Sequence, residues 1–159
     1  MNEWVKHAEA KAAATLAAAG VTGGVLYNLV KAQTSPSWFM ATAASVCGIG
    51  VLLAGASAIA ALWPRLRSKE AATSSLYFDH IARRHPKSHT AYVAEFTNLV
   101  TSPMALLEQL AQQVWSNARV ARRKYFWGGM ALVLLVISLA GLAAVAADLA
   151  LVSVGVLNG

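Results

Sequence analysis

The sequence predicts an all-α integral membrane protein with three transmembrane helices and a small cytoplasmic helical module. Three stretches, 12–30, 38–64 and 125–147, contain no Asp, Glu, Lys, Arg or His. Each is close to the ~20 residues that a helix needs to cross ~30 Å of hydrocarbon. The composition agrees, because 13% of the residues are charged, which is about half the share found in soluble domains.

The charged residues concentrate in one segment, 65–124, between the second and third stretches. It holds ten Lys and Arg against four Asp and Glu, so its net charge of +6 equals that of the whole chain. The sequence therefore divides into a two-span hairpin (1–64), a basic module (65–124) and a third span with an external tail (125–159). About sixty residues bury too little surface for an independent domain with a sizeable core, so we expect a homo-oligomer.

The first span, 12–30, is rich in Ala and Gly, whereas the third is rich in Leu, Val and Ile. Gly20 and Gly24 form a GxxxG pair, and Gly50 and Ala54 repeat the small-residue spacing in the second span. Such spacing lets helix backbones approach closely and favours packing on protein over lipid. The alternative is that Ala and Gly are simply common in membrane helices.

The distribution of Lys and Arg predicts the orientation, because basic residues near the ends of spans stay in the cytoplasm. Lys6 and Lys11 precede the first span, and the tail after Asp148 has no basic residue. Seven further basic residues flank the second and third spans on the same side: Arg65, Arg67, Lys69, Arg119, Arg122, Arg123 and Lys124. We expect the N-terminus and the basic module in the cytoplasm. No ionisable residue lies deep in a span, which argues against an ion-coupled transporter.

The basic module is predicted to be helical, because 65–124 contains no glycine for tight β turns. A first helix is expected at 68–84, ended by His85 because the residue before proline disfavours helical dihedrals. A second is expected to begin after Ser88 or Thr90 and to end at Val100.

The last cytoplasmic helix is expected to begin at Pro103, with Ser102 as its N-cap. No helix breaker follows before Gly128, so we predict one helix over 103–147 that continues into the third span. Apolar residues recur along it at steps of three and four, which defines the 104–125 stripe: Met104, Leu107, Ala111, Val114, Ala118, Ala121 and Tyr125. The expected core of the module comprises Leu76, Phe78, Ile81, Val93, Phe96, Leu107, Leu110 and Val114.

Motifs for catalysis and for metal binding are missing from the sequence. It contains no nucleophile elbow, P-loop, HExxH or paired carboxylates, so we predict that the protein is not an enzyme. His80, His85 and His89 lie within ten residues of one another. Pro86 prevents His85 and His89 from converging on one helix face, so we expect neither a metal site nor a cofactor.

Three basic residues far from any span form a candidate binding site: Arg83, Arg84 and Lys87, with Tyr77, His80 and Tyr92 nearby in sequence. Arginine binds phosphate through two parallel hydrogen bonds, and aromatic faces stack on bases. The cluster therefore suits a small anionic ligand with a planar ring. A solvated basic turn is the alternative. Long nucleic acid is a poor partner, since one turn offers few phosphate contacts.

Short sequence blocks in a fixed order connect the chain to a known family. They are Ala8-Glu9-Ala10-Lys11 in the first helix, Leu76-Tyr77-Phe78-Asp79-His80-Ile81-Ala82 with Tyr92 in the module, and Ala121-Arg122-Arg123-Lys124-Tyr125 before the last span. In these blocks the sequence resembles the transmembrane effectors of Pycsar anti-phage defence, and the resemblance covers nearly the whole chain.

The resemblance implies a function in infected bacteria. Such effectors are switched on by a cyclic pyrimidine mononucleotide, cyclic CMP or cyclic UMP, made by a partner pyrimidine cyclase. They then impair the inner membrane, and the cell stops growing before phage mature. Two alternatives follow from the residues: a ligand-independent oligomeric channel or holin-like protein, and a structural scaffold whose 104–125 stripe binds a partner helix.

Overall fold

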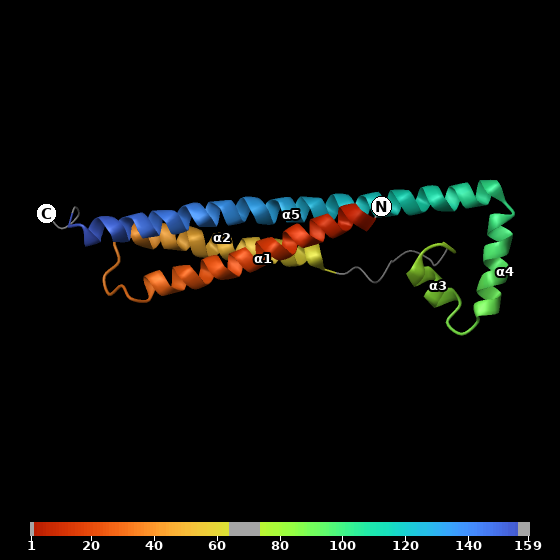
Figure 1. The fold of residues 1–159 in the computed structure, drawn as a ribbon, viewed down its shortest axis with the longest axis horizontal. Coiled ribbons are helices and arrows are strands. Elements are labelled where there is room, and N and C mark those ends of the chain that lie inside the picture. Colours follow the sequence, from red (N-terminus) through yellow and green to blue (C-terminus); the bar gives the residue numbers. More distant parts are fainter. Residues whose placement is uncertain (1, 64–73, 156–159) are drawn as a thin grey trace. The chain divides into compact units, whose positions relative to one another are not determined.

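A computed structural model of the chain describes residues 2–63 and 74–155. In these ranges it consists of helices and turns, as predicted (Figure 1). The five helices are α1 (Asn2–Val30), α2 (Trp38–Leu62), α3 (Phe78–Arg84), α4 (His89–Val100) and α5 (Pro103–Ser153). Three segments, Val5–Val30, Trp38–Leu62 and Pro103–Ser153, are long and apolar enough to cross a membrane. The predicted all-α membrane fold is confirmed.

Serine side chains set two of the helix starts. Ser37 precedes α2 and its Oγ accepts a hydrogen bond from the backbone N of Met40 at 3.0 Å. Ser88 precedes α4 and its Oγ accepts from the backbone N of Ala91 at 3.2 Å. Each satisfies a backbone donor that has no partner inside the first helical turn. Of the two caps proposed for α4, Ser88 is the one that the structure uses.

The helix expected at 68–84 is only partly correct. Residues 74–77 are not helical, and α3 begins at Phe78; residues 68–73 lie outside the described ranges. The Oγ of Ser74 accepts from the backbone N of Leu76 at 3.3 Å, and the backbone N of Ser74 donates to His80 Nδ1 at 3.2 Å. These bonds give the backbone partners outside a helix, which is how serine competes with helix formation.

The prediction of one helix from the module into the third span is confirmed. α5 is unbroken over 51 residues, a length of about 76 Å at 1.5 Å per residue. It begins at Pro103 as expected and continues to Ser153, beyond the expected end at Ala147. The first residue with positive φ after it is Gly155, whose φ is 78°, so the backbone turns only there.

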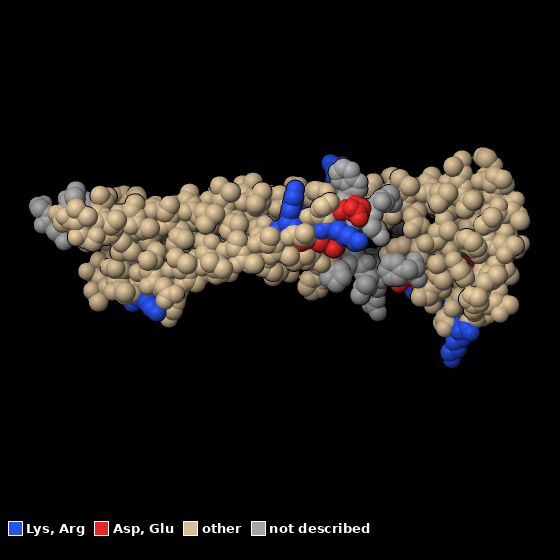
Figure 2. All heavy atoms as spheres, in the orientation of Figure 1, with Lys and Arg blue, Asp and Glu red and all other residues tan. Residues whose placement is uncertain are grey.

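The chain separates into two compact groups of residues, 1–63 with 123–159, and 64–122. We call the first the helix bundle and keep the name basic module for the second. In the bundle, Ala19 of α1, Ala54 of α2 and Leu135 of α5 form the buried cluster. Figure 2 shows charged side chains near both ends of α1 and a surface without them in between.

Close backbone contact in the bundle occurs between α2 and α5. A Cβ added at Gly141 would lie 3.1 Å from the carbonyl O of Ala43 and 3.1 Å from the backbone N of Cys47. One added at Gly50 would collide with Ser138. A methyl group at Gly141 would meet the backbone of α2 and push the two helices apart, whereas one at Gly50 would displace the Ser138 hydroxyl.

Gly20 and Gly24 make no close contact inside one chain. Among the described residues, no other part of the chain comes within 4 Å of an added Cβ at either position, because both are on the exposed face of α1. The face of α1 that packs is marked instead by Ala8, Ala12, Thr15, Ala19 and Thr22, all buried. A role for Gly20 and Gly24 between copies stays a prediction.

Two polar contacts join α5 to the hairpin. The Lys124 Nζ donates to the Glu9 carboxylate of α1. Near the other end, the Oγ of Ser37 donates to Asp148 Oδ2 at 3.0 Å, and Asp148 is buried. One contact thus joins α5 to the beginning of α1, and the other joins it to the turn between α1 and α2.

The predicted core of the basic module is not formed in a single chain. Five of its members are exposed: Val93, Phe96, Leu107, Leu110 and Val114. Leu76 and Ile81 are half-buried, and the side chain of Phe78 is not described. The described residues of the module bury Leu99, Ser75 and His80 instead. Two short helices and one face of α5 provide too little surface to cover more.

Candidate functional site

The candidate site lies in the basic module and centres on Glu95 of α4. Its Oε1 accepts a hydrogen bond from Arg84 Nη1 at 2.9 Å and another from the Oγ of Ser75. Its Oε2 accepts from His85 Nε2 at 3.0 Å. One carboxylate thus holds the end of α3, the following turn and the segment before α3.

These contacts change the acidity of Glu95. The hydrogen bond from Ser75 lowers the pKa of the Glu95 carboxyl, and the hydrogen bond from His85 and the positive charge of Arg84 lower it further against partial burial. A carboxylate that accepts several hydrogen bonds is stabilised in its charged form. Glu95 is therefore a persistent anion at neutral pH.

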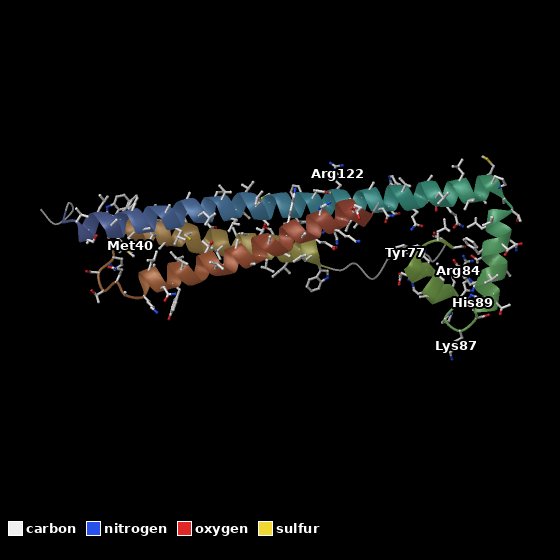
Figure 3. The ribbon with its side chains drawn as sticks, in the orientation of Figure 1. Met40, Tyr77, Arg84, Lys87, His89 and Arg122 are labelled. Carbon is white, nitrogen blue, oxygen red and sulfur yellow. The ribbon has the colours of Figure 1, made fainter. Side chains whose placement is uncertain are left out.

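The predicted cations have different surroundings. Arg84 is bound to Glu95, and Arg83 pairs with Asp79 one turn earlier on α3 at 2.9 Å. Both arginine side chains remain nearly half exposed. Lys87 lies in the turn between α3 and α4 and extends away from both helices (Figure 3). Its side chain has no carboxylate within salt-bridge distance among the described residues.

The predicted aromatic residues are only partly available. His80 is buried and its ring meets the ring of Tyr77 edge to face, with centroids 5.0 Å apart. Tyr92 packs between His85 and Phe96, at centroid distances of 5.8 and 5.9 Å. His80 thus serves the packing of the module, whereas Tyr92 and Phe96 form a tilted pair of rings on the same helix as Glu95, the partner of Arg84.

Ser75 connects this site to α5. Its Oγ donates to Glu95, its backbone N donates to Gln109 Oε1 of α5 at 3.0 Å, and its carbonyl O accepts from the hydroxyl of Tyr92 at 3.4 Å. Ser75 is buried. Ser75 is therefore hydrogen-bonded to both α4 and α5.

Glu95, Ser75 and Gln109 were missed by the sequence analysis, which considered cations and rings alone. One signal was present: Glu95 is the only acidic residue between Asp79 and Glu108. A single acid within a run of Arg, Lys and His is expected to pair with them. Ser75 and Gln109 gave no such signal. Among the described residues, no group of three His, Cys, Asp or Glu side chains is arranged to hold a metal ion.

Comparisons with known proteins identify the family. A profile of the Pycsar effector protein domain, PycTM, matches residues 1–151. The chain belongs to the Pycsar effector family. Among individual Pycsar effectors, the protein PtPycTM of Propioniciclava tarda is 32% identical over 153 residues, which are 95% of this chain and 76% of the relative. No solved structure matches the chain.

Family membership confirms the resemblance found in the sequence blocks. It implies an effector of anti-phage defence, and the three apolar helices indicate that this Pycsar effector acts as a membrane protein. The site around Glu95 is the place in its basic module where exposed cations, a hydrogen-bonded carboxylate and aromatic rings come together.

Proposed function

We propose that the protein binds a cyclic pyrimidine mononucleotide, cyclic CMP or cyclic UMP, at the Arg84–Glu95 site and then impairs the inner membrane. It acts without catalysis, as a homo-oligomer, and a pyrimidine cyclase supplies the nucleotide. The observation that carries the proposal is the match to the Pycsar effector domain over residues 1–151. The contact between the partly exposed Arg84 and Glu95 supports it.

The charge of the site supports a singly charged ligand. Arg83, Arg84 and Lys87 carry three positive charges, and Asp79 and Glu95 carry two negative ones. One positive charge is left over, which matches the single negative charge of a cyclic phosphodiester. The side chains of Arg83 and Arg84 are 45% and 43% exposed, so an incoming phosphate meets them without crossing a core.

Binding at Arg84 requires an exchange of partners. In the structure its guanidinium contacts Glu95 at 2.9 Å. A phosphate that takes this guanidinium offers the same bidentate geometry as a carboxylate, and the base is then placed near Tyr92 and Phe96, where it stacks. The ligand phosphate thus replaces Glu95 as the partner of Arg84, and the arginine has an anionic partner both before and after binding.

The exchange has a route to the membrane. When Glu95 loses Arg84, its contact with Ser75 is free to shift, and the backbone of Ser75 is held by Gln109 on α5. α5 continues to Ser153 without a break. A ligand changes a conformational equilibrium only through different affinities for the two states. Here the difference lies in whether Arg84 is bound to Glu95 or to phosphate.

The same proposal places the N-terminus and the basic module in the cytoplasm, where the nucleotide is made. The flanking Lys and Arg support this orientation. Four of them, Arg119, Arg122, Arg123 and Lys124, lie in one short stretch of α5 just before its apolar part.

The first test is a calorimetric titration of the detergent-purified protein with cyclic CMP, cyclic UMP, cyclic AMP and cyclic GMP. We expect binding of a pyrimidine nucleotide and a loss of roughly 10- to 100-fold in affinity for Arg84→Glu, because a hydrogen bond to a charged group contributes ~1.5–3 kcal/mol. Arg123→Glu makes the same change of charge away from the site and is expected to keep the affinity.

Growth and dye entry complete the test. Cells that express the protein are expected to admit a membrane-impermeant dye only when a pyrimidine cyclase is co-expressed, and Arg84→Glu is expected to abolish this dependence. If no nucleotide binds and the toxicity is the same with and without the cyclase, the proposal is contradicted and a ligand-independent channel is favoured. Equal losses for Arg84→Glu and Arg123→Glu would remove the Glu95 site from the proposal.

A further inference from the structure

Six of the seven residues of the 104–125 stripe on α5 are exposed in the structure, and Ala121 is half-buried. Met104, Leu107 and Val114 are 77%, 61% and 54% exposed, and Ala111 and Ala118 between them are exposed as well. No helix of the same chain covers these side chains among the described residues. An apolar row of this length on a water-facing helix is a protein contact surface.

The spacing of the stripe specifies the kind of contact. From Met104 to Tyr125 the steps are three and four in strict alternation, which is a seven-residue repeat over three heptads. A straight α-helix drifts by ~20° per heptad relative to such a repeat. A strict repeat therefore suits another helix that supercoils with it, with the stripe at the a and d positions.

The flanks of the stripe agree with a parallel pairing of two copies. In that pairing each g residue faces the e residue of the following heptad on the other helix. The pairs are Leu110 with Trp115, both exposed, and Asn117 with Arg122. The Leu110–Trp115 pair widens the apolar contact. The Asn117–Arg122 pair does not place two like charges opposite each other. Arg119 stacks on the Trp115 ring of its own chain, 4.7 Å from the centroid, at the rim.

The membrane excludes the opposite orientation. α5 continues from the stripe into the apolar part of the third candidate span. Two copies inserted in the same bilayer with the same topology must present this helix in the same direction. A second copy of this chain, parallel and in register, is therefore the occupant that fits the spacing, the flanking charges and the direction.

We propose that two or more copies associate through the 104–125 stripe as a parallel coiled coil that precedes the membrane. The proposal deepens the proposed function by naming the surface of the homo-oligomer, and it does not depend on the nucleotide. Alanine at Ala111, Ala118 and Ala121 allows the helices to approach closely while burying little apolar area per copy. The contact is therefore weak enough to be made and broken.

Cysteine cross-linking in native membranes tests the proposal. In a Cys47→Ala background, Ala111→Cys and Ala118→Cys are expected to form homodimers on oxidation, because equivalent a positions face each other only when the helices are parallel and in register. Ser116→Cys, at the exposed f position, is the matched control and is expected to cross-link several-fold less. Each variant is measured without nucleotide and with cyclic CMP or cyclic UMP.

Every outcome bears on the proposal. Preferred cross-linking at positions 111 and 118 over 116, in any of these conditions, supports it even if no nucleotide binds. Equal cross-linking at all three positions, or none in any condition, overturns it. A cross-linked product heavier or lighter than twice the chain shows a different protein on the stripe and also overturns it. The failure of nucleotide sensing is thus distinguished from the failure of this contact.

Discussion

At the scale of single residues, Glu95 holds the basic cluster together. Its carboxylate accepts hydrogen bonds from Arg84, His85 and Ser75 at once. Without it these three donors would have no shared acceptor. In the proposed function, Glu95 is the internal anion that a phosphate replaces at the Arg84 guanidinium.

A pH titration measures this contact. The Glu95 pKa is lowered in the folded protein, chiefly by the hydrogen bond from Ser75. The stability that this carboxylate contributes is therefore present above the ordinary Glu pKa of ~4.3 and is lost as the pH falls through the lower pKa of the folded state. Thermal melts of the wild type and Glu95→Gln are expected to differ most above pH ~5 and to converge in stronger acid.

The control for this titration is Glu108→Gln. Glu108 is an exposed acid on α5 whose carboxylate accepts a hydrogen bond from the neutral side chain of Gln112, at 3.5 Å. Its replacement is expected to shift the melting temperature little at any pH. A gap between wild type and Glu95→Gln that stays constant from neutral pH to strong acid would refute the role of the charged carboxylate.

Residue identities gave the site in part. Arginine and lysine at 83, 84 and 87 were recognisable because none of them is needed for membrane topology. His80 was assigned to the ligand, but the structure buries it. The burial of His80 depends on the path of the segment before α3. That path is held by hydrogen bonds from the backbone N of Ser74 and of Ser75, and such bonds leave no periodic pattern in the sequence.

At the scale of helices, α2 and α5 pack closely because each supplies a glycine to the contact. Gly50 leaves space for the side chain of Ser138, and Gly141 lies against the backbone of Ala43 and Cys47. Small residues permit this separation in a membrane, where apolar side chains gain little by leaving lipid. The sequence predicted Gly50 and Ala54 as packing residues, and both lie in the contact region of α2.

Gly141→Ala tests this contact. The added methyl group would lie 3.1 Å from two backbone atoms of α2, which cannot move away as a side chain can. We expect a destabilisation of about 1–3 kcal/mol, measured as unfolding in mixed detergent and dodecyl sulfate.

Gly20→Ala is the matched control. Its added methyl group meets nothing within 4 Å, and alanine favours a helix over glycine by up to ~1 kcal/mol. It is expected to be neutral or stabilising inside one chain. Equal destabilisation by both variants would contradict the α2–α5 contact, whereas a loss of oligomer for Gly20→Ala alone would assign Gly20 to contacts between copies.

Helix boundaries were predictable where one residue decides them. Pro103 begins a helix as expected, and Ser88, one of the two expected caps, precedes another. The face that a helix buries was less predictable. Gly20 and Gly24 carried the stronger motif, but α1 packs through Ala12, Ala19 and their neighbours. An alanine-rich helix has small residues on every side, so its composition does not show which face packs against the rest of the bundle.

At the scale of the whole molecule, α5 joins the basic module to the membrane. Its 51 residues contain no proline after the first position. The sequence predicted this continuity, because no helix breaker lies between Pro103 and Gly128. The division of the chain into groups was harder to predict, because the end of α5 packs with α1 and α2 although it follows the module in sequence.

Val120→Pro tests whether α5 transmits the signal. Proline removes one backbone hydrogen bond and clashes with the preceding turn, at a cost of ~3 kcal/mol in a helix interior. We expect nucleotide affinity to be kept and nucleotide-dependent dye entry to be lost. Val120→Ala leaves the helix intact and is expected to keep both.

Two results would count against transmission through α5. Dye entry that survives Val120→Pro would show that an unbroken helix is not required. Loss of binding as well as dye entry would show that the kink disturbs the nucleotide site itself.

The hydrogen bond from Ser37 to Asp148 has a consequence for how the bundle comes apart. These residues are 111 positions apart in the sequence, and Ser37 also caps α2. A carboxyl group has a far greater affinity for water than an apolar side chain. Separation of α5 from α2 would therefore leave the buried Asp148 carboxyl without its hydroxyl donor unless water replaced it. The end of the bundle remote from Lys124 thus holds a polar contact that has to be exchanged for water whenever the two helices part.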